Sequence, residues 1–156
     1  MAASQGTGPI HVVALGASNT AGHGVGVDNA YPAVIERLLR ARGLDVRVEN
    51  AGISGNTTGE MLTRLDASVP HGTRVVLFQP GSNDARRGVD GAVRERNIAT
   101  LQDSLKARGV RVIRVAAAFE CARPGNLQAD GIHFTEAGHE LIARYLVEQV
   151  AEALAH

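Results

Sequence analysis

The segment IHVVALGASN, residues 10–19, is a short apolar and β-branched run that ends at Gly16. Such a run is typical of a strand that is buried on both faces, as in a parallel sheet. Further runs of this kind occur at 46–50, 74–79 and 110–117, with helical patterns between them. Because strands alternate with helices, the sequence predicts an α/β fold in which helices cover both faces of a parallel sheet.

Amphipathic patterns predict helices at 31–42, 57–67, 91–108 and 136–154. The last of them follows Thr135, a residue type that caps helix N-termini. We expect the apolar side chains of this last helix to face the core. They are Leu141, Ile142, Tyr145, Leu146 and Val150.

The chain has 156 residues, which fits one domain, and we assign 10–156 to it and 1–9 to a loose N-terminal segment. Its 16 basic and 16 acidic side chains give a formal net charge of zero, and aromatic residues make up only 3%. These values argue against a nucleic acid as partner, because such proteins carry basic patches and aromatic stacking platforms. Cys121 is the only cysteine, so an intramolecular disulfide and a multi-cysteine metal site are both excluded.

The first residues, MAASQGTGPIH, lack the basic and apolar regions of a signal peptide. No apolar run approaches the roughly 20 residues that a membrane-spanning helix needs. We therefore expect no membrane span. The expected location is cytoplasmic if the chain is complete, and periplasmic or secreted if a signal peptide has been removed.

Chemically useful groups follow the ends of the predicted strands, where the working site of a parallel α/β sheet lies. The first three strands are followed by a hydroxyl on Ser18, an unobstructed backbone N–H at Gly55 and an amide at Asn83. Asp130 and His133, three positions apart, precede the last helix. A nucleophile, a base with its orienting acid, and donors for an oxyanion are the parts that acyl transfer uses.

These segments resemble the sequence blocks of the SGNH (GDSL-like) hydrolases. LGASNTAGHGVG is similar to LGDSLTAGYGVG of the arylesterase and thioesterase branch, and NAGISGNTT to NAGVSGDTT. PGSND resembles the GGND block, and DGIHFTEAGH resembles DGIHPTEAGH. The resemblance implies a flavodoxin-like three-layer α/β/α sandwich and an esterase that needs no metal or cofactor. Carried over by position, it makes Ser18 the nucleophile, His133 the base and Asp130 its partner. The oxyanion hole would consist of the Ser18 N–H, the Gly55 N–H and the Asn83 side chain.

The chain departs from these blocks at three places. Ala17 stands where the block has an acid, so the hydrogen bonds of that carboxylate are missing. Asn19 stands where Leu is usual and makes the floor of the pocket more polar. The segment 119–129 is too short for a further helix and a fifth strand, so we expect four strands in the order 2-1-3-4. Arg111 and Arg114 would then guard the exposed edge of the fourth strand.

The same short segment predicts a small acyl site. We expect Phe119, Leu127 and Phe134 to cover a short acyl chain, so the expected substrates are short-chain acyl or aryl esters. The pair 86–87 (Arg-Arg) is expected to be a solvated loop pair, with contact to an anionic substrate as the alternative because it borders the site. Asp84 is expected to hold the loop after the third strand. A small-molecule ester is thus the expected partner, and a homo-oligomer remains compatible with the sequence.

Two other functions fit parts of the sequence. Ala17 is compatible with a catalytically weakened binding module on the same fold, and the fold itself with a flavodoxin-like nucleotide or flavin binder. The glycine run 22–26 lacks the glycine spacing of a dinucleotide-binding motif and the lysine of a P-loop. Asp130, His133 and His139 do not form a recognised metal-binding pattern, so no metal site is expected.

Overall fold

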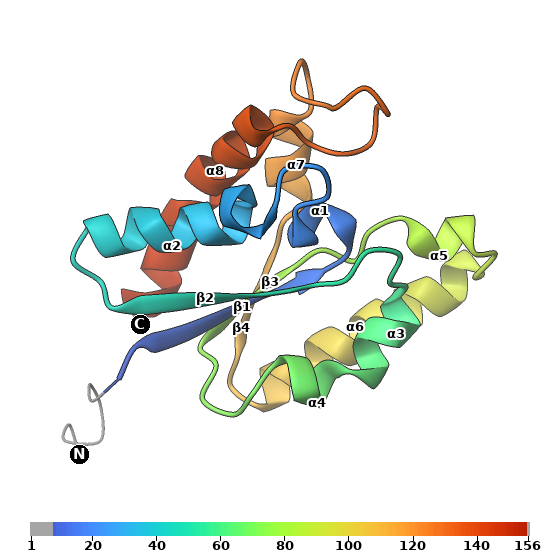
Figure 1. The fold of residues 1–156 in the computed structure, drawn as a ribbon. Helices are drawn as coiled ribbons and strands as arrows, with labels where there is room; N and C mark the ends of the chain where they lie inside the picture. The colour runs from blue at the N-terminus through green and yellow to red at the C-terminus, as the bar shows by residue number, and fades with distance from the viewer. Residues whose placement is uncertain (1–7, 156) are drawn as a thin grey trace.

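The computed structural model describes residues 8–155. The predicted loose segment 1–9 therefore lies almost entirely outside the described residues. Helices pack on both faces of a central parallel sheet, which gives the three layers that the sequence predicted (Figure 1). Each face has its own apolar core.

The sheet consists of four strands that pair in parallel in the order β2-β1-β3-β4. They are β1 (Ile10–Gly16), β2 (Val46–Gly52), β3 (Val75–Phe78) and β4 (Arg111–Arg114). The predicted order is confirmed, and no strand within residues 8–155 pairs with the outer edge of β4. The central strands β1 and β3 are buried almost throughout, which explains their continuous apolar runs.

The two faces of the sheet carry different sets of helices (Figure 1). One face is covered by α1 (Ser18–Ala21), the 3₁₀ turn η2 (Val27–Asn29), α2 (Tyr31–Ala41), α7 (Ala116–Ala122) and α8 (Glu136–Ala155). The other is covered by α3 (Thr58–Thr63), α4 (Leu65–Ser68) and α6 (Gly91–Ala107), with α5 (Asn83–Arg86) beyond the end of β3. The carboxyl ends of the strands, where α1 and α5 begin, are thus left between the two helical layers.

Two predicted elements have different bounds in the structure. The predicted helix 57–67 is divided into α3 and α4, and the side chain at the junction, Arg64, donates to the carbonyls of Gly16 and Ala51. The predicted strand 110–117 was too long, because the backbone of Val115 leaves the extended conformation and α7 begins at the next residue. The alanines that follow are strong helix formers.

Helix α8 begins as predicted but presents a narrower apolar face. Thr135 accepts a hydrogen bond from the N–H of Gly138 at 3.1 Å, which confirms it as the cap. Ile142 and Leu146 are fully buried, whereas Leu141 and Tyr145 are 47% and 43% exposed. The expectation that these last two face inward was wrong. Each lies about 100° around the helix from its buried neighbour, so it falls outside the buried stripe.

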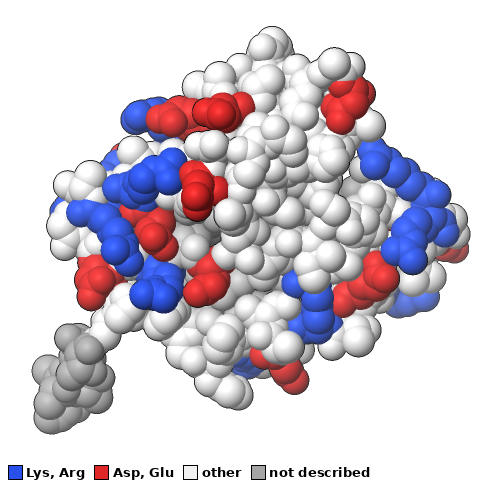
Figure 2. Space-filling model, in the orientation of Figure 1, with Lys and Arg blue, Asp and Glu red and all other residues white. Residues whose placement is uncertain are grey.

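Charged side chains are unevenly spread over the surface. Figure 2 shows them gathered over α2 and around α5, whereas the surface over α1 is uncharged. Among residues 8–155, no helix combines the length and the apolar character that crossing a membrane requires.

Candidate active site

The tight turn after β1 carries Ser18 as the first residue of α1. Gly16 closes the strand at a place where there is no room for a side chain. A Cβ there would collide with the side chains of Thr20 and Gln79. The glycine therefore lets β3 approach the turn closely enough to support it.

Gln79, directly after β3, holds this turn. Its Oε1 accepts hydrogen bonds from the N–H of Ala17 at 3.0 Å and from the hydroxyl of Thr20 at 2.7 Å. Because the single Thr20 proton is given to Gln79, the Tyr31 hydroxyl 2.8 Å away donates to Thr20. Burial raises the pKa of Tyr31, which keeps this donor protonated. The turn that has lost an acid at Ala17 is thus supported by a buried hydrogen-bond network.

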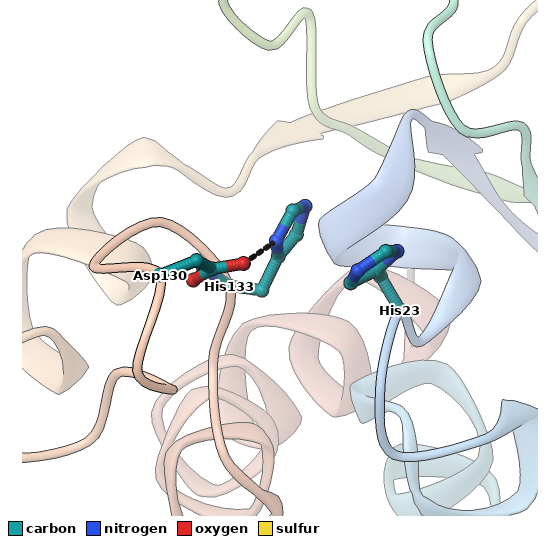
Figure 3. Close-up of side chains that lie close together, drawn as sticks. All are labelled: His23, Asp130 and His133. Carbon is teal, nitrogen blue, oxygen red and sulfur yellow. Dashed lines mark hydrogen bonds and ion pairs between the residues drawn. The ribbon is translucent and has the colours of Figure 1, made fainter.

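Ser18, His133 and Asp130 form a continuous chain of hydrogen bonds. Ser18 Oγ lies 2.8 Å from His133 Nε2, and His133 Nδ1 lies 2.6 Å from Asp130 Oδ2, the contact dashed in Figure 3. The other Asp130 oxygen accepts from the N–H groups of Ile132 and His133 at 2.9 and 3.0 Å. The His133 side chain, and then these backbone donors, hold the pKa of Asp130 well below its usual range. The ionised carboxylate favours a proton on Nδ1, which leaves the Nε2 lone pair facing Ser18.

The loop that carries His133 is held by Asn19. Asn19 Nδ2 donates to the carbonyl of Ile132 at 3.2 Å, and its Oδ1 accepts from the N–H of Phe134 at 3.1 Å. These two bonds lie on either side of His133. From sequence we expected Asn19 only to make the pocket more polar, so this positioning role was missed. The signal was present, because Asn offers both a donor and an acceptor where Leu offers neither.

The imidazole of His23 stacks on that of His133. The ring centroids lie 4.0 Å apart with the planes inclined by 27°, and Figure 3 shows the two rings side by side. Sequence analysis also missed His23, although it stands where the resembling block has Tyr. Ligand atoms of His23, Asp130 and His133 lie within 4.8 Å of one another. Nearly parallel rings, however, direct their lone pairs side by side and not at one point, so this arrangement suits stacking better than metal ligation.

His139 lies apart from Asp130 and His133. It is fully buried in α8, where its Nδ1 accepts a hydrogen bond from the N–H of Tyr31 at 3.0 Å. Its Nε2 has no hydrogen-bond partner among the described residues. Burial lowers the pKa of His139 to about 4, so the side chain is neutral at neutral pH.

The expected oxyanion donors follow β1, β2 and β3. Gly55 has a φ of 83°, a conformation that favours glycine. Asn83 Nδ2 donates to the carbonyl of Asn56 at 3.0 Å, which ties the loop after β3 to the loop after β2. The N–H groups of Ser18 and Gly55 make no hydrogen bond within residues 8–155, so both are free to donate to a substrate.

Asp84 joins the loop after β3 to the start of α3, which follows the loop after β2. It is fully buried and accepts from the N–H of Thr58 at 2.8 Å and from its hydroxyl at 2.6 Å. Asp84 thus holds the loop after β3, as expected. Arg87 is engaged as well, because its Nη1 donates to Glu60 at 2.8 Å and to the carbonyl of Gly55 at 3.3 Å.

A cavity of 440 Å³ opens at the end of the sheet that carries the Ser18 turn. Its wall includes Asn19 and Ile132, the chain neighbours of the hydrogen-bonded serine and histidine. Of the three side chains expected to cover an acyl chain, only Phe119 is part of this wall. Phe134 is fully buried against the Phe119 ring, with centroids 5.0 Å apart, and Leu127 packs against the same core. Neither lies where a substrate in this cavity would touch it.

The blocks around the site agree with a known family. A model described as the GDSL-like lipase/acylhydrolase family matches residues 14–126. The chain belongs to this family. The matched range includes the turn of Ser18 together with Gly55 and Asn83. It ends before Asp130 and His133, whose assignment rests on the resemblance of their block and on the hydrogen bonds described above.

Two curated relatives match part of this chain. An arylesterase of Vibrio mimicus is 34% identical over 113 residues, which covers 72% of this chain and 56% of the relative. Esterase TesA of Pseudomonas aeruginosa is 31% identical over 103 residues, which covers 65% of this chain and 51% of TesA. The chain therefore spans about half the length of the curated relatives it matches.

Solved structures share the fold. The crystal structure of TesA superposes with a TM-score of 0.82 at 24% identity, covering 92% of this chain and 99% of that one. The SGNH-hydrolase family esterase AlinE4 gives a TM-score of 0.69 at 24% identity, covering 96% of this chain and 99% of that one. The sheet of four parallel strands between two helical layers is thus a GDSL-like hydrolase fold.

Proposed function

We propose that this GDSL-like protein is a carboxylic ester hydrolase with Ser18 as its nucleophile. The observation that carries the proposal is the unbroken hydrogen-bond chain from Ser18 Oγ through His133 to Asp130. Membership of the GDSL-like family and the names of the two relatives, an arylesterase and an esterase, support the same activity.

The geometry suits a two-step acyl transfer. Ser18 Oγ attacks the ester carbonyl while His133 Nε2 accepts its proton, and the Asp130 carboxylate stabilises the imidazolium that forms. The N–H groups of Ser18 and Gly55 and the amide of Asn83 donate to the developing oxyanion. His133 then protonates the departing alcohol. In the second step His133 activates a water molecule, which releases the acid and regenerates Ser18.

The size of the site favours short acyl or aryl groups. Phe119 and Ile132 supply apolar wall beside the reacting groups, and a buried methylene gains about 0.8 kcal/mol. Once a neutral chain extends beyond these side chains, further methylenes gain nothing. We expect kcat/KM on p-nitrophenyl esters to be highest from acetate to butyrate and to fall by octanoate. A maximum at decanoate would contradict this part of the proposal.

A fluorophosphonate probe tests the activity itself, because it reacts only with an activated serine. The expected result is one label per chain, located on Ser18 by peptide mapping and absent from Ser18→Ala. Ser104→Ala, an exposed serine of α6, is the matched control and should label like the wild type. An unlabelled wild type would favour the weakened binding module, and bound flavin absorbance would favour the flavin binder.

A further inference from the structure

Basic side chains from four parts of the chain converge on the cavity beside Ser18. The wall contains four arginines and a single acid, Glu120. The arginines are Arg86 at the end of α5, Arg94 of α6, Arg114 at the end of β4 and Arg123 just after α7. Because these elements are distant in sequence, the fold itself brings the positive charges together.

Most of these charges have no acidic partner. Arg94 contacts Glu95 at 3.1 Å and donates to the carbonyl of Gly81 at 2.8 Å. No carboxylate of residues 8–155 lies within ion-pair distance of Arg86, Arg114 or Arg123. Other arginines of the chain do find acids. Examples are Arg42 with Glu148, Arg87 with Glu60, and Arg144 with Glu140.

Two of the unpaired arginines are held in place by uncharged groups. Arg114 donates to Gln102 at 3.1 Å, and its guanidinium lies 5.6 Å from the centre of the Phe78 ring. The guanidinium of Arg123 lies 5.6 Å from the centre of the Phe134 ring. A cation–π contact of this kind favours one position of the guanidinium and uses none of its N–H groups. Both side chains are therefore oriented without being neutralised.

Placing these charges together costs free energy that an anion would recover. Partial burial, and then the like charge of Arg94, lower the pKa of Arg114. A guanidinium presents a planar set of donors that matches the two oxygens of a carboxylate. The cavity is therefore suited to a carboxylate. Its own acid, Glu120, forms no ion pair with Arg114 or Arg123.

The position of the cavity connects this charge with the reaction. Its wall includes Asn19 and Ile132, next to Ser18 and His133, and Ser82, next to Asn83. We propose that the substrate is a carboxylate-bearing ester, whose carboxylate binds Arg114 and Arg123 while its ester carbonyl lies at Ser18. The proposal rests on the ester hydrolysis proposed above and specifies its substrate class.

The test compares charged and neutral esters of the same size. Mono-p-nitrophenyl adipate against p-nitrophenyl hexanoate places the carboxylate on the acyl side. Acetoxybenzoate, the para isomer, against its methyl ester places it on the leaving-group side. We expect kcat/KM to be about 10–100-fold higher for the charged member of one pair, the range of a charge-assisted hydrogen-bond pair. Added salt should reduce this ratio.

Variants connect the preference to the two arginines. In the double variant Arg114→Gln and Arg123→Gln, the ratio should fall close to one. Arg114→Lys keeps the charge and should retain part of the preference, which separates an electrostatic role from a structural one. Arg111→Gln removes an exposed charge from the same strand outside this cavity, and should leave the ratio unchanged.

The two proposals fail in different ways. If Ser18 is labelled and both neutral esters are hydrolysed, but neither charged ester is preferred, the substrate class is overturned and the hydrolase stands. If nothing is hydrolysed or labelled, calorimetric titration of Ser18→Ala with adipate decides whether the cavity binds a carboxylate. Binding that disappears in Ser18→Ala carrying Arg114→Gln and Arg123→Gln would support the charged cavity, and no binding would overturn it.

Discussion

The two sides of the Ser18 turn are held in different ways. On one side lie the loops that carry the proposed oxyanion donors Gly55 and Asn83, residues 52–58 and 80–84, here called the oxyanion loops. On the other lies the loop of the proposed base His133, residues 128–135, here called the base loop. The oxyanion loops continue directly from β2 and β3, and the buried Asp84 joins them through Thr58. The base loop continues from no strand, and its anchors include the side chains of Asn19 and Gln128.

This difference shows which parts of the site depend on the fold and which depend on individual side chains. The proposed oxyanion donors are placed by strand ends and by one buried carboxylate. The proposed base is held by polar side chains: Gln128 within its own loop, and Asn19, which reaches across from the turn after β1. Asn19 and His23, two of the residues that contact the base loop, are also positions at which this chain differs from the family block it resembles. The base side thus includes two of the positions at which this chain departs from that block.

Removing Ser18 or His133 should have the largest effect, because the proposed reaction needs the serine hydroxyl and the imidazole together. We expect Ser18→Ala and His133→Ala each to lower kcat on p-nitrophenyl acetate by about 10⁴–10⁶, and the double variant to lose little more, since the two act as a unit. Circular dichroism should show that both variants fold. Turnover near that of the wild type in either variant would show that the nucleophile or the base lies elsewhere.

Asn83→Ala tests the oxyanion loops alone. Losing one donor to the developing charge should lower kcat by roughly 10²–10³ with a smaller change in KM. Asn29→Ala is the matched control and should keep wild-type kcat, because this exposed side chain bonds, within residues 8–155, only to the carbonyl of Val25. A change confined to KM would mean that Asn83 binds the substrate without stabilising the oxyanion.

Acid should destabilise the fold through His139, which is buried in α8, the helix that follows the base loop. Its pKa is about 4 in the folded protein, below the ordinary value of 6.5. The unfolded chain therefore binds a proton first as the pH falls. Neutral His139 therefore contributes to the free energy of unfolding in full above pH 6.5. This contribution decreases between pH 6.5 and 4, and the total loss is about 3 kcal/mol at most.

Urea unfolding at several pH values measures this effect. The difference in unfolding free energy between wild type and His139→Gln should change between pH 7.5 and 4.5 in favour of the variant, whose side chain does not titrate. His71→Gln, an exposed histidine before β3, serves as the control and should follow the wild type. A constant difference across this pH range would mean that His139 is not protected from protonation by the fold.

Asn19→Leu should have the smallest effect, and it restores the residue of the family block. Two hydrogen bonds that position His133 are lost, at about 1 kcal/mol each when well formed, so kcat should fall by up to about 30-fold. KM for p-nitrophenyl acetate should change less, because the hydroxyl and the oxyanion donors remain. Asn29→Leu is the control. An unchanged kcat would show that Gln128 and the His23 stack suffice to hold the base loop.

The sheet and the grouping of Ser18, His133 and Asp130 could be predicted from local patterns. Buried parallel strands give continuous apolar runs, and reactive groups follow the strand ends in recognisable blocks. The start of α7 was missed because the run VIRVAAAF at 112–119 suits a strand and a helix equally well in apolar content.

The supports of the site were beyond sequence analysis for a different reason. Gln79 bonds to Ala17 across 62 positions, and Asn19 bonds to Ile132 across 113. The periodicity of a sequence reflects only neighbours within one helix or strand, so it cannot predict partners so far apart. The arginines of the cavity are likewise scattered between Arg86 and Arg123, so only the arrangement of β4, α6 and α7 shows that they meet. For the same reason the burial of Phe134, which removes it from the acyl site, could not be anticipated.

The short helix α7 has a practical consequence for watching the site at work. It supplies Phe119 and Glu120 to the cavity wall, and the next residue along the helix is the exposed Cys121, the only thiol of the chain. A maleimide dye attached there needs no engineered cysteine and no removal of competing ones. Its emission would report, in real time and on a single molecule if needed, when a ligand enters or leaves the space beside Ser18.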